Sequence, residues 1–245
     1  MISVCMATYN GERFLREQVD SILCQLGPDD ELIISDDGST DGTLGIIESY
    51  NDSRIRLLHH EKENNSYFKQ TTVLCATQNF CNALRYVSGE YIFLADQDDV
   101  WHKDKIQICV KQLKNSCFVM SNFSIIDENG VQGTELFYSE NPFKKTVVSN
   151  LLYPHFIGCC CCFRKEILQR VLPVSERVYS HDLWIGIVAI HFYDVCFLDI
   201  PLIQHRVHSS NASLACKKTN NSLLFRLKYR FLILIELLKL GIASR

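Results

Sequence analysis

The sequence predicts an α/β fold in which helices cover an open, largely parallel β-sheet. Short apolar runs that resemble strands alternate with helix-like segments over residues 1–122, which is typical of repeated βα units. Polar clusters follow several of these runs, at the strand ends where such sheets bind ligands. The chain is long enough for a large core, since 47% of its 245 residues are apolar.

The elements can be assigned in order along the chain. The expected strands of the first half are Ile2–Ala7, Glu31–Ser35, Ile55–His59, Tyr91–Ala95 and Cys117–Asn122. The expected helices are Phe14–Leu26, Gly42–Tyr50, Asn79–Val87, which ends at a plausible Ser88–Gly89 cap, and Lys103–Lys114. After a polar loop that reaches about residue 150, we expect a strand at Phe156–Phe163, a helix at His181–Ile190, and strands at Val195–Asp199 and Leu202–Val207.

Charge divides the chain into an acidic body and a basic tail. The net charge is −3, but residues 217–245 carry +6 and residues 1–216 carry −9. We expect one domain at 1–216, with halves at about 1–122 and about 123–216, followed by the tail. An acidic body does not suit a nucleic-acid-coating protein, so no nucleic acid partner is expected.

The twelve cysteines indicate a reducing compartment rather than a disulfide framework. The chain begins MISVCMATYN, without a basic segment and a long apolar stretch, so no signal peptide is expected and the predicted location is the cytoplasm. The run Cys159–Cys162 reads as a buried strand, because neighbouring thiolates on a strand point to opposite faces and cannot easily close one zinc site.

Three carboxylates follow the apolar strand YIFLA, at Asp96, Asp98 and Asp99. One interpretation is a solvated turn that caps a helix. The other is a cation site, because three like charges repel unless a cation relieves them, and carboxylate oxygens together with phosphate oxygens suit Mg²⁺ or Mn²⁺.

The segment from Asp37 to Glu48 has the ligand spacing of an EF-hand calcium loop. An incoming helix is missing, because the preceding ELIIS reads as a buried strand, and a tight strand-to-helix turn with Asp41 near the N-cap fits better. No G-x-G-x-x-G or P-loop follows any strand, so a nucleotide would bind through carboxylates and a metal rather than a glycine cradle.

Two clusters in the second half carry ionisable groups. Asp182 begins an apolar helix, where it fits either an N-cap or a general base in a cleft. His205 and His208 would lie on opposite faces of a strand end, so at most one of them is expected to be a ligand.

Taken in order, ATYNGERFL, SDDGSTDGT, SGEYIFLADQDDVW, HDLW and HRVHSSN resemble the family 2 glycosyltransferases of the GT-A fold, in particular the rhamnosyltransferase-like branch that builds surface polysaccharides. The resemblance covers about residues 2–211. It implies a Rossmann-like, mostly parallel mixed sheet flanked by helices. It also implies inverting transfer of a sugar, with rhamnose as a candidate, from a nucleoside diphosphate sugar to a glycan or lipid-linked acceptor with Mg²⁺ or Mn²⁺.

The resemblance also assigns roles to individual residues. The family's nucleotide-sugar-binding positions match Thr8, Tyr9, Glu12, Asp36, Asp37 and Asp96, with Asp36 at the pyrimidine ring. Its metal-binding DxD motif matches Asp96 and Asp98, and its metal-shell histidine matches His208. The catalytic base matches Asp182, and we expect the pocket to be shaped by Trp101 and Trp184.

Two departures from the family pattern concern the diphosphate and the acceptor. The stretch that often carries a basic residue reads Ala76-Thr77-Gln78-Asn79, and Cys159–Cys162 replaces small or hydroxylic residues on the acceptor side. A non-catalytic homologue that binds nucleotide sugars is the alternative. A sugar-1-phosphate nucleotidyltransferase is disfavoured, since the chain has no Gly-rich basic N-terminal loop.

The basic tail forms an amphipathic helix when residues 223–242 are placed on a helical wheel. The expected apolar stripe is Leu223, Leu227, Phe231, Leu234, Ile235, Leu238 and Ile242. Its longest apolar run is too short to span a bilayer. The stripe would pack either on the protein's own core or, as we prefer, at an anionic cytoplasmic membrane surface.

Overall fold

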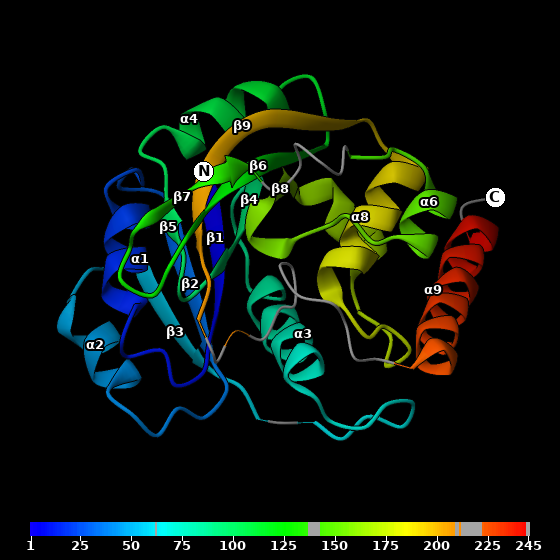
Figure 1. The fold of residues 1–245 in the computed structure, drawn as a ribbon, viewed down its shortest axis with the longest axis horizontal. Helices are drawn as coiled ribbons and strands as arrows, with labels where there is room; N and C mark the ends of the chain where they lie inside the picture. The colour runs from blue at the N-terminus through cyan, green and yellow to red at the C-terminus, as the bar shows by residue number, and fades with distance from the viewer. Residues whose placement is uncertain (62, 137–142, 209–210, 212–221, 244–245) are drawn as a thin grey trace.

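The computed structural model describes residues 1–61, 63–136, 143–208, 211 and 222–243. The expected domain boundary at residues 216 and 217 lies outside this part of the chain, so the domain division stays a prediction. Figure 1 shows one mixed sheet with helices on both sides and a long helix, α9, at one end. The predicted α/β class is confirmed.

The first four strands are parallel and pair in the order β3-β2-β1-β4. They are β1 (Ile2–Thr8), β2 (Glu31–Asp36), β3 (Ile55–His59) and β4 (Tyr91–Asp96). The chain runs from β1 outward to β3 and then returns to the other side of β1, so the strand order reverses between β1 and β4. Ligands of open α/β sheets bind at such a reversal.

The helices of this half are α1 (Leu15–Leu23), α2 (Thr43–Ser49) and α3 (Thr72–Leu84). In Figure 1, α1 and α2 lie on one side of these strands and α3 on the other. Helix α3 begins seven residues before the predicted Asn79, because the Thr71 side chain accepts a hydrogen bond from the backbone N–H of Leu74 and caps the helix there.

The turn after β2 is the predicted strand-to-helix turn, not an EF-hand, since a strand precedes it. Asp41 accepts hydrogen bonds from the backbone and hydroxyl of Thr43 and so holds the start of α2. Gly38 has φ = +79°, a conformation that favours glycine.

The second half extends the sheet in the order β8-β6-β9-β5, with β7 paired to β6. The elements are β5 (Val100–Trp101), α4 (Lys105–Leu113), β6 (Phe118–Ile126), β7 (Gln132–Leu136), α6 (Val147–Leu152), β8 (Cys161–Arg164), α7 (Leu168–Val171), α8 (His181–Phe192) and β9 (Val195–Arg206), with 3-10 turns at Gly158–Cys160 and Lys165–Ile167. Strand β8 runs antiparallel to both neighbours, which makes the sheet mixed.

Several details of this half differ from the prediction. Strands β5 and β7 and helices α6 and α7 were not expected, and the two strands expected from Val195 to Val207 form one strand, β9. The strand expected at Phe156–Phe163 is shorter, since Cys159 and Cys160 lie in a 3-10 turn. All four cysteines of the run are buried, and all cysteines of the described residues are free.

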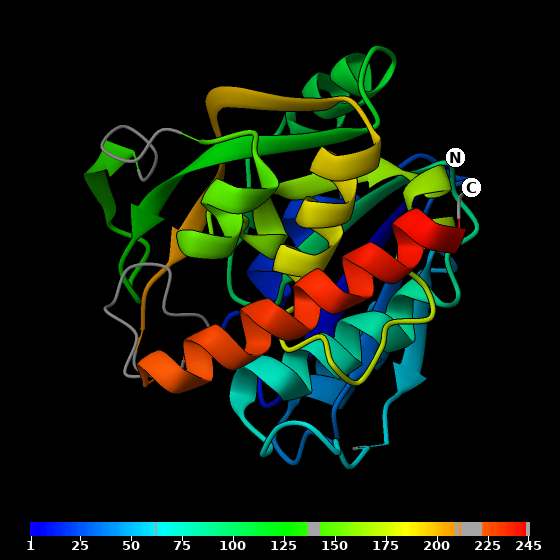
Figure 2. The same ribbon diagram turned by 90° about the vertical axis from the view of Figure 1, so that its right-hand side faces the viewer.

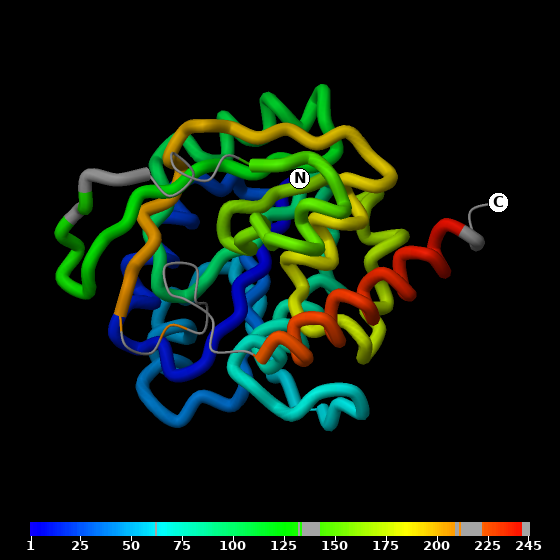
Figure 3. The backbone as a smooth tube through the Cα atoms, turned by 45° about the vertical axis from the view of Figure 1, so that its right-hand side comes forward, coloured from blue at the N-terminus to red at the C-terminus, as the bar shows by residue number. Residues whose placement is uncertain are grey.

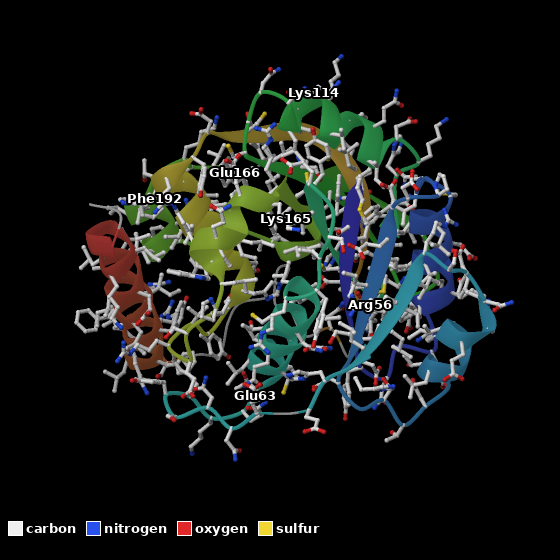
Figure 4. The ribbon with its side chains drawn as sticks, turned by 180° about the vertical axis from the view of Figure 1, so that it is seen from behind. Arg56, Glu63, Lys114, Lys165, Glu166 and Phe192 are labelled. Carbon is white, nitrogen blue, oxygen red and sulfur yellow. The ribbon has the colours of Figure 1, made fainter. Side chains whose placement is uncertain are left out.

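Strand β3 forms one edge of the sheet and presents the exposed Arg56 side chain, which Figure 4 labels. Arg56 packs over the Tyr86 ring at 4.8 Å from its centroid. A charged side chain on an edge strand disfavours pairing with a further strand.

Helix α9 (Leu223–Ala243) lies across α3 and α8 in Figure 2. Tyr229, Ile233 and Leu237 are its buried side chains. Much of the predicted stripe faces outward instead, because Leu223, Leu227, Phe231 and Leu238 are all more than half exposed. No helix in the described part of the chain is long and apolar enough to cross a membrane.

Candidate active site

A cleft of about 410 Å³ lies at the carboxyl ends of β1 and β4, where the strand order reverses. Helix α3, the turn at Gly158 and the start of α8 form its other walls. Six of the residues predicted from the sequence line it: Thr8, Tyr9, Asp37, Asp96, Asp98 and Asp182. The fold therefore brings together groups that are up to 174 positions apart in the chain.

Asp98 lies close to His208, which follows the last strand, β9, by two residues. The Nε2 atom of His208 lies 2.8 Å from Asp98 Oδ2, and Asn211 donates to the same oxygen at 3.3 Å. Asn211 is itself held by the backbone carbonyl of Arg206 at 2.9 Å. The segment that follows β9 thus closes onto the turn that follows β4.

The carboxylate of Asp96 ends β4 and enters the cleft. Burial, together with the negative charges of Asp99 and Asp98, raises the pKa of Asp96 to about 8. A divalent cation at this point would lower that pKa again and favour the carboxylate form. Carboxylate oxygens suit Mg²⁺ or Mn²⁺, so the chemistry of Asp96 and Asp98 fits the predicted metal, and Asp98 is the one of the two that contacts His208.

His205 has a different partner, as expected for the opposite face of the strand. Its Nδ1 lies 2.8 Å from Asp99 Oδ1, and the backbone N–H of Arg206 donates to the same oxygen at 3.1 Å. Burial opposes protonation of His205, but the Asp99 carboxylate more than compensates and raises the pKa of His205 to about 10. A buried ion pair therefore joins the turn after β4 to β9.

Cys159 completes a compact group with this pair, since potential ligand atoms of Asp99, Cys159 and His205 all lie within 4.8 Å of one another. A hydrogen bond with Cys160, and then burial, raises the pKa of the Cys159 thiol well above its usual range. Metals bind the thiolate, so this protonated thiol fits packing better than metal binding.

Asp182 lies in the first turn of α8 and faces the cleft. Ser180, not Asp182, is the N-cap residue. The Oδ1 atom of Asp182 accepts hydrogen bonds from the Ser180 hydroxyl and from the backbone N–H of Leu183. Among the described residues only Oδ1 has such partners, which leaves Oδ2 available to accept a proton.

The residues expected at the nucleotide occupy two different environments. Both carboxylate oxygens of Asp36 are hydrogen-bonded, to the Thr8 hydroxyl at 2.9 Å, the Ser39 hydroxyl at 2.6 Å and the backbone N–H groups of Gly38 and Ser39 at 3.0 and 2.8 Å. Asp36 does not line the cleft. Its neighbour Asp37 does, and Asp37 Oδ1 lies 2.9 Å from Nδ1 of His60.

Three other predicted residues lie away from the cleft. Glu12 accepts a hydrogen bond from the backbone N–H of Gly42 at 2.6 Å and so ties the loop after β1 to α2. Trp101 and Trp184 are buried, where Trp101 packs on Phe93 and Trp184 donates to the carbonyl of Val171. Neither tryptophan lines the cleft, so the expectation that they shape it is wrong.

The cleft also contains polar residues that the sequence motifs did not indicate. Asn79 lines the cleft and donates to the Thr8 carbonyl at 3.1 Å, while its buried Oδ1 has no partner among the described residues. Gln97 accepts from the Tyr9 N–H at 2.9 Å and donates to the Tyr9 carbonyl at 3.1 Å. The Gln97 amide packs directly on Gly11, since a Cβ there would lie 2.3 Å from Gln97 Oε1.

Comparison with known proteins gives the same family over most of the chain. The family model described as "Glycosyl transferase family 2" matches residues 3–172. The dTDP-rhamnosyl transferase RfbG of Shigella flexneri is 36% identical over 94% of this chain and 79% of its own. The UDP-Glc:alpha-D-GlcNAc-diphosphoundecaprenol beta-1,3-glucosyltransferase WfgD of Escherichia coli is 26% identical over 89% of this chain and 81% of its own.

Solved structures show the same fold. Residues 1–349 of S. aureus TarS, crystallised with UDP-GlcNAc, superpose with a TM-score of 0.70 at 18% identity over 97% of this chain and 66% of that chain. This chain thus spans just under two thirds of that structure. The mannosyltransferase PcManGT of Pyrobaculum calidifontis, in complex with GDP-Man and Mn²⁺, superposes with a TM-score of 0.60 at 19% identity, over 99% of this chain and 72% of that chain. The chain has the GT-A fold and belongs to glycosyltransferase family 2.

Proposed function

We propose that this chain is a metal-dependent, inverting glycosyltransferase that moves a sugar from a nucleoside diphosphate to a glycan or lipid-linked acceptor in surface polysaccharide synthesis. The observation that carries this proposal is the cleft in which Asp96, Asp98 and Asp182 meet. Transfer to a sugar hydroxyl needs a group that accepts its proton and a means to stabilise the leaving diphosphate. Separate carboxylates are available for the two tasks.

Asp98, Asp96 and His208 would hold Mg²⁺ or Mn²⁺. The metal, when bound, would neutralise the charge that develops on the leaving diphosphate. This contribution matters here because no lysine or arginine is among the described residues that line the cleft. The stretch Ala76-Thr77-Gln78-Asn79 lacks the basic residue common in the family, and it contributes Ala76 and Asn79 to the cleft.

Asp182 would act as the general base. Its Oδ1 is fixed by Ser180 and Leu183, so the carboxylate is oriented before the acceptor binds. Oδ2 would take the proton of the acceptor hydroxyl as that oxygen attacks the anomeric carbon. Attack from the side opposite the leaving diphosphate would invert the configuration without a covalent enzyme intermediate.

Thr8, Tyr9 and Asp37 would bind the nucleoside. Asp37 is better placed than Asp36 to accept a hydrogen bond from a pyrimidine N–H, because Asp37 lines the cleft and Asp36 does not. Tyr9, 49% exposed, offers a ring face for stacking on the base.

Rhamnose is the donor sugar that we favour. RfbG, named as a dTDP-rhamnosyl transferase, is 36% identical to this chain. The wall of the cleft formed by Val73, Ala76, Phe80 and Ile157 is apolar. Such a wall suits the methyl group of a 6-deoxyhexose better than the hydroxymethyl group of a hexose, which would lose hydrogen bonds to water there.

The proposed location is the cytoplasm, at the membrane that would carry a lipid-linked acceptor. The free cysteines throughout the described residues support a reducing compartment. WfgD, whose name specifies a diphosphoundecaprenol-linked substrate, supports the lipid-linked class of acceptor.

A thermal-shift screen tests the donor class directly. A ligand that binds the folded state raises the melting temperature in step with the logarithm of its concentration over Kd. We expect dTDP-rhamnose with Mn²⁺ to stabilise the protein more than UDP-glucose with Mn²⁺, and either sugar without Mn²⁺ to have little effect. Equal shifts for the two sugars would contradict the rhamnose assignment, and shifts independent of Mn²⁺ would contradict the metal.

A further inference from the structure

Helix α9 has two apolar faces, of which only one is used within the protein. The inner face packs through Tyr229, Ile233 and Leu237, which are 8%, 0% and 4% exposed. The outer face presents Leu223, Leu224, Leu227, Phe231 and Leu238, which are 54% to 79% exposed. In Figure 3 the C-terminal part of α9 extends away from the rest of the chain.

The outer side chains form one continuous stripe. At 100° per residue, Leu224, Leu227, Phe231 and Leu238 fall within about 60° of arc. The largest apolar patches on ordinary monomers reach only a few hundred Å², and larger ones mark interaction sites. The described residues contain nothing that covers this stripe.

Cations border the stripe on both sides. Lys228 and Lys239 lie along one edge of the wheel, where Lys228 donates to the Tyr67 carbonyl and Lys239 pairs with Glu236 at 2.9 Å, and Arg230 lies along the other edge. The single acid of the helix, Glu236, has a largely buried side chain and pairs with both Arg177 at 2.7 Å and Lys239 at 2.9 Å, so basic residues still outnumber acids on the helix. The outer face is therefore apolar at its centre and positive at its borders.

We propose that this outer face of α9 lies in the interfacial region of an anionic lipid bilayer. A helix with an apolar stripe and a cationic border binds there by burying the stripe among acyl chains while its cations contact anionic headgroups. A second copy of the chain fits less well, because a two-fold interface would place one cationic border against another.

The inner face connects this surface to the active site. Tyr179 packs on Phe225 and Tyr229 of α9, with ring centroids 5.0 and 5.8 Å apart. The Tyr179 carbonyl accepts a hydrogen bond from Thr77, a residue of α3, at 3.2 Å. Tyr179 precedes Asp182, the proposed catalytic base, by three positions. Binding of α9 to a membrane would therefore bring the segment from Tyr179 to Asp182 close to the membrane surface.

Co-sedimentation with vesicles tests the proposal and needs neither donor nor transfer, so its outcome is independent of the proposed reaction. We expect the full chain to bind vesicles of mixed phosphatidylglycerol and phosphatidylcholine and to bind pure phosphatidylcholine more weakly. The double substitution Leu224→Glu and Phe231→Glu should weaken binding at least about a hundredfold, because each buried side chain contributes about 1.5–3 kcal/mol. Lys239→Gln, at a side chain that is 55% exposed, should weaken binding to the anionic vesicles about fivefold.

The matched control is Val131→Glu with Ile200→Glu, which places two acids on exposed apolar residues outside α9. This control should bind as the unchanged chain does, and all variants should keep the unchanged melting temperature because the substituted side chains are exposed. Equal binding by the α9 double variant would overturn the proposal, as would failure of the unchanged chain to bind anionic vesicles. Sedimentation velocity tests the alternative that a second copy of the chain binds the stripe. A dimer that the double variant abolishes would assign the stripe to that second copy and overturn the membrane proposal.

Discussion

His208 Nε2 lies 2.8 Å from Asp98 Oδ2, although the two residues are 110 positions apart in the chain. Strand β9 creates this proximity, because it runs parallel to β6 and antiparallel to β5 and so ends beside the turn that follows β4. The distance means that one cation could contact both the turn after β4 and the segment after β9.

Asp98→Asn should remove the Mn²⁺-dependent part of donor binding. The amide keeps an acceptor for Asn211 but loses the negative charge that a hard cation requires. We would measure melting temperature with dTDP or UDP, with and without Mn²⁺. Asp104→Asn, at a half-exposed acid outside the cleft, is the control and should retain the full Mn²⁺ effect. An unchanged Mn²⁺ effect in Asp98→Asn would remove Asp98 from the metal site.

Asp182→Asn should separate binding from transfer. Loss of a general base costs about 10²–10⁴-fold in rate, whereas the donor contacts of Thr8, Asp37 and Asp98 stay in place. We therefore expect the donor to stabilise the variant as before while single-turnover transfer falls by that factor. Asp194→Asn, at the exposed far end of α8, is the matched control. Transfer at the unchanged rate in Asp182→Asn would show that another group takes the proton.

Asp36 and Asp37 are neighbours with different expected roles, which paired substitutions can distinguish. Asp36→Asn leaves one acceptor oxygen where two serve Thr8, Gly38 and Ser39, so it should reduce the free energy of unfolding by about 1–3 kcal/mol. Asp37→Asn should instead weaken donor binding with a smaller loss of stability. Denaturant unfolding and donor titration of both variants would measure these effects. If Asp36→Asn weakened donor binding and Asp37→Asn mainly lowered stability, Asp36 would be the residue that contacts the nucleobase.

The first four strands and the acidic turn could be predicted because local patterns determine them. Apolar runs of strand length followed by Asp36, Asp96 or Asp98 mark carboxyl ends, and parallel strands bring such ends to one edge. Asp182 could be placed in the same site only through the family resemblance, since the composition of its helix fits a structural cap equally well.

The remaining features depend on contacts between distant residues. Asn79 and Gln97 enter the cleft through hydrogen bonds to Thr8 and Tyr9, which lie 71 and 88 positions away. The direction of α9 could not be predicted either. Its helix is apolar on nearly all sides, and only contacts such as those of Tyr179 with Phe225 determine which face turns inward.

The ion pair between Asp99 and His205 predicts a stability that depends on pH. The pKa of His205 rises from its ordinary value of about 6.5 to about 10 in the folded chain, mainly through Asp99 with contributions from Asp96 and Asp98. The stabilisation is therefore complete below about pH 6.5 and is lost as the pH rises toward 10. Removal of one partner of a buried pair costs about 3–5 kcal/mol. We thus expect the free energy of unfolding of His205→Gln to be about 3 kcal/mol lower than that of the unchanged chain at pH 6. This difference in unfolding free energy should become steadily smaller up to pH 10. Urea unfolding in EDTA and a reductant would measure it, with the half-exposed His102→Gln as a control of constant small effect. A gap that stays the same from pH 6 to pH 10 would mean that His205 is neutral in the folded protein.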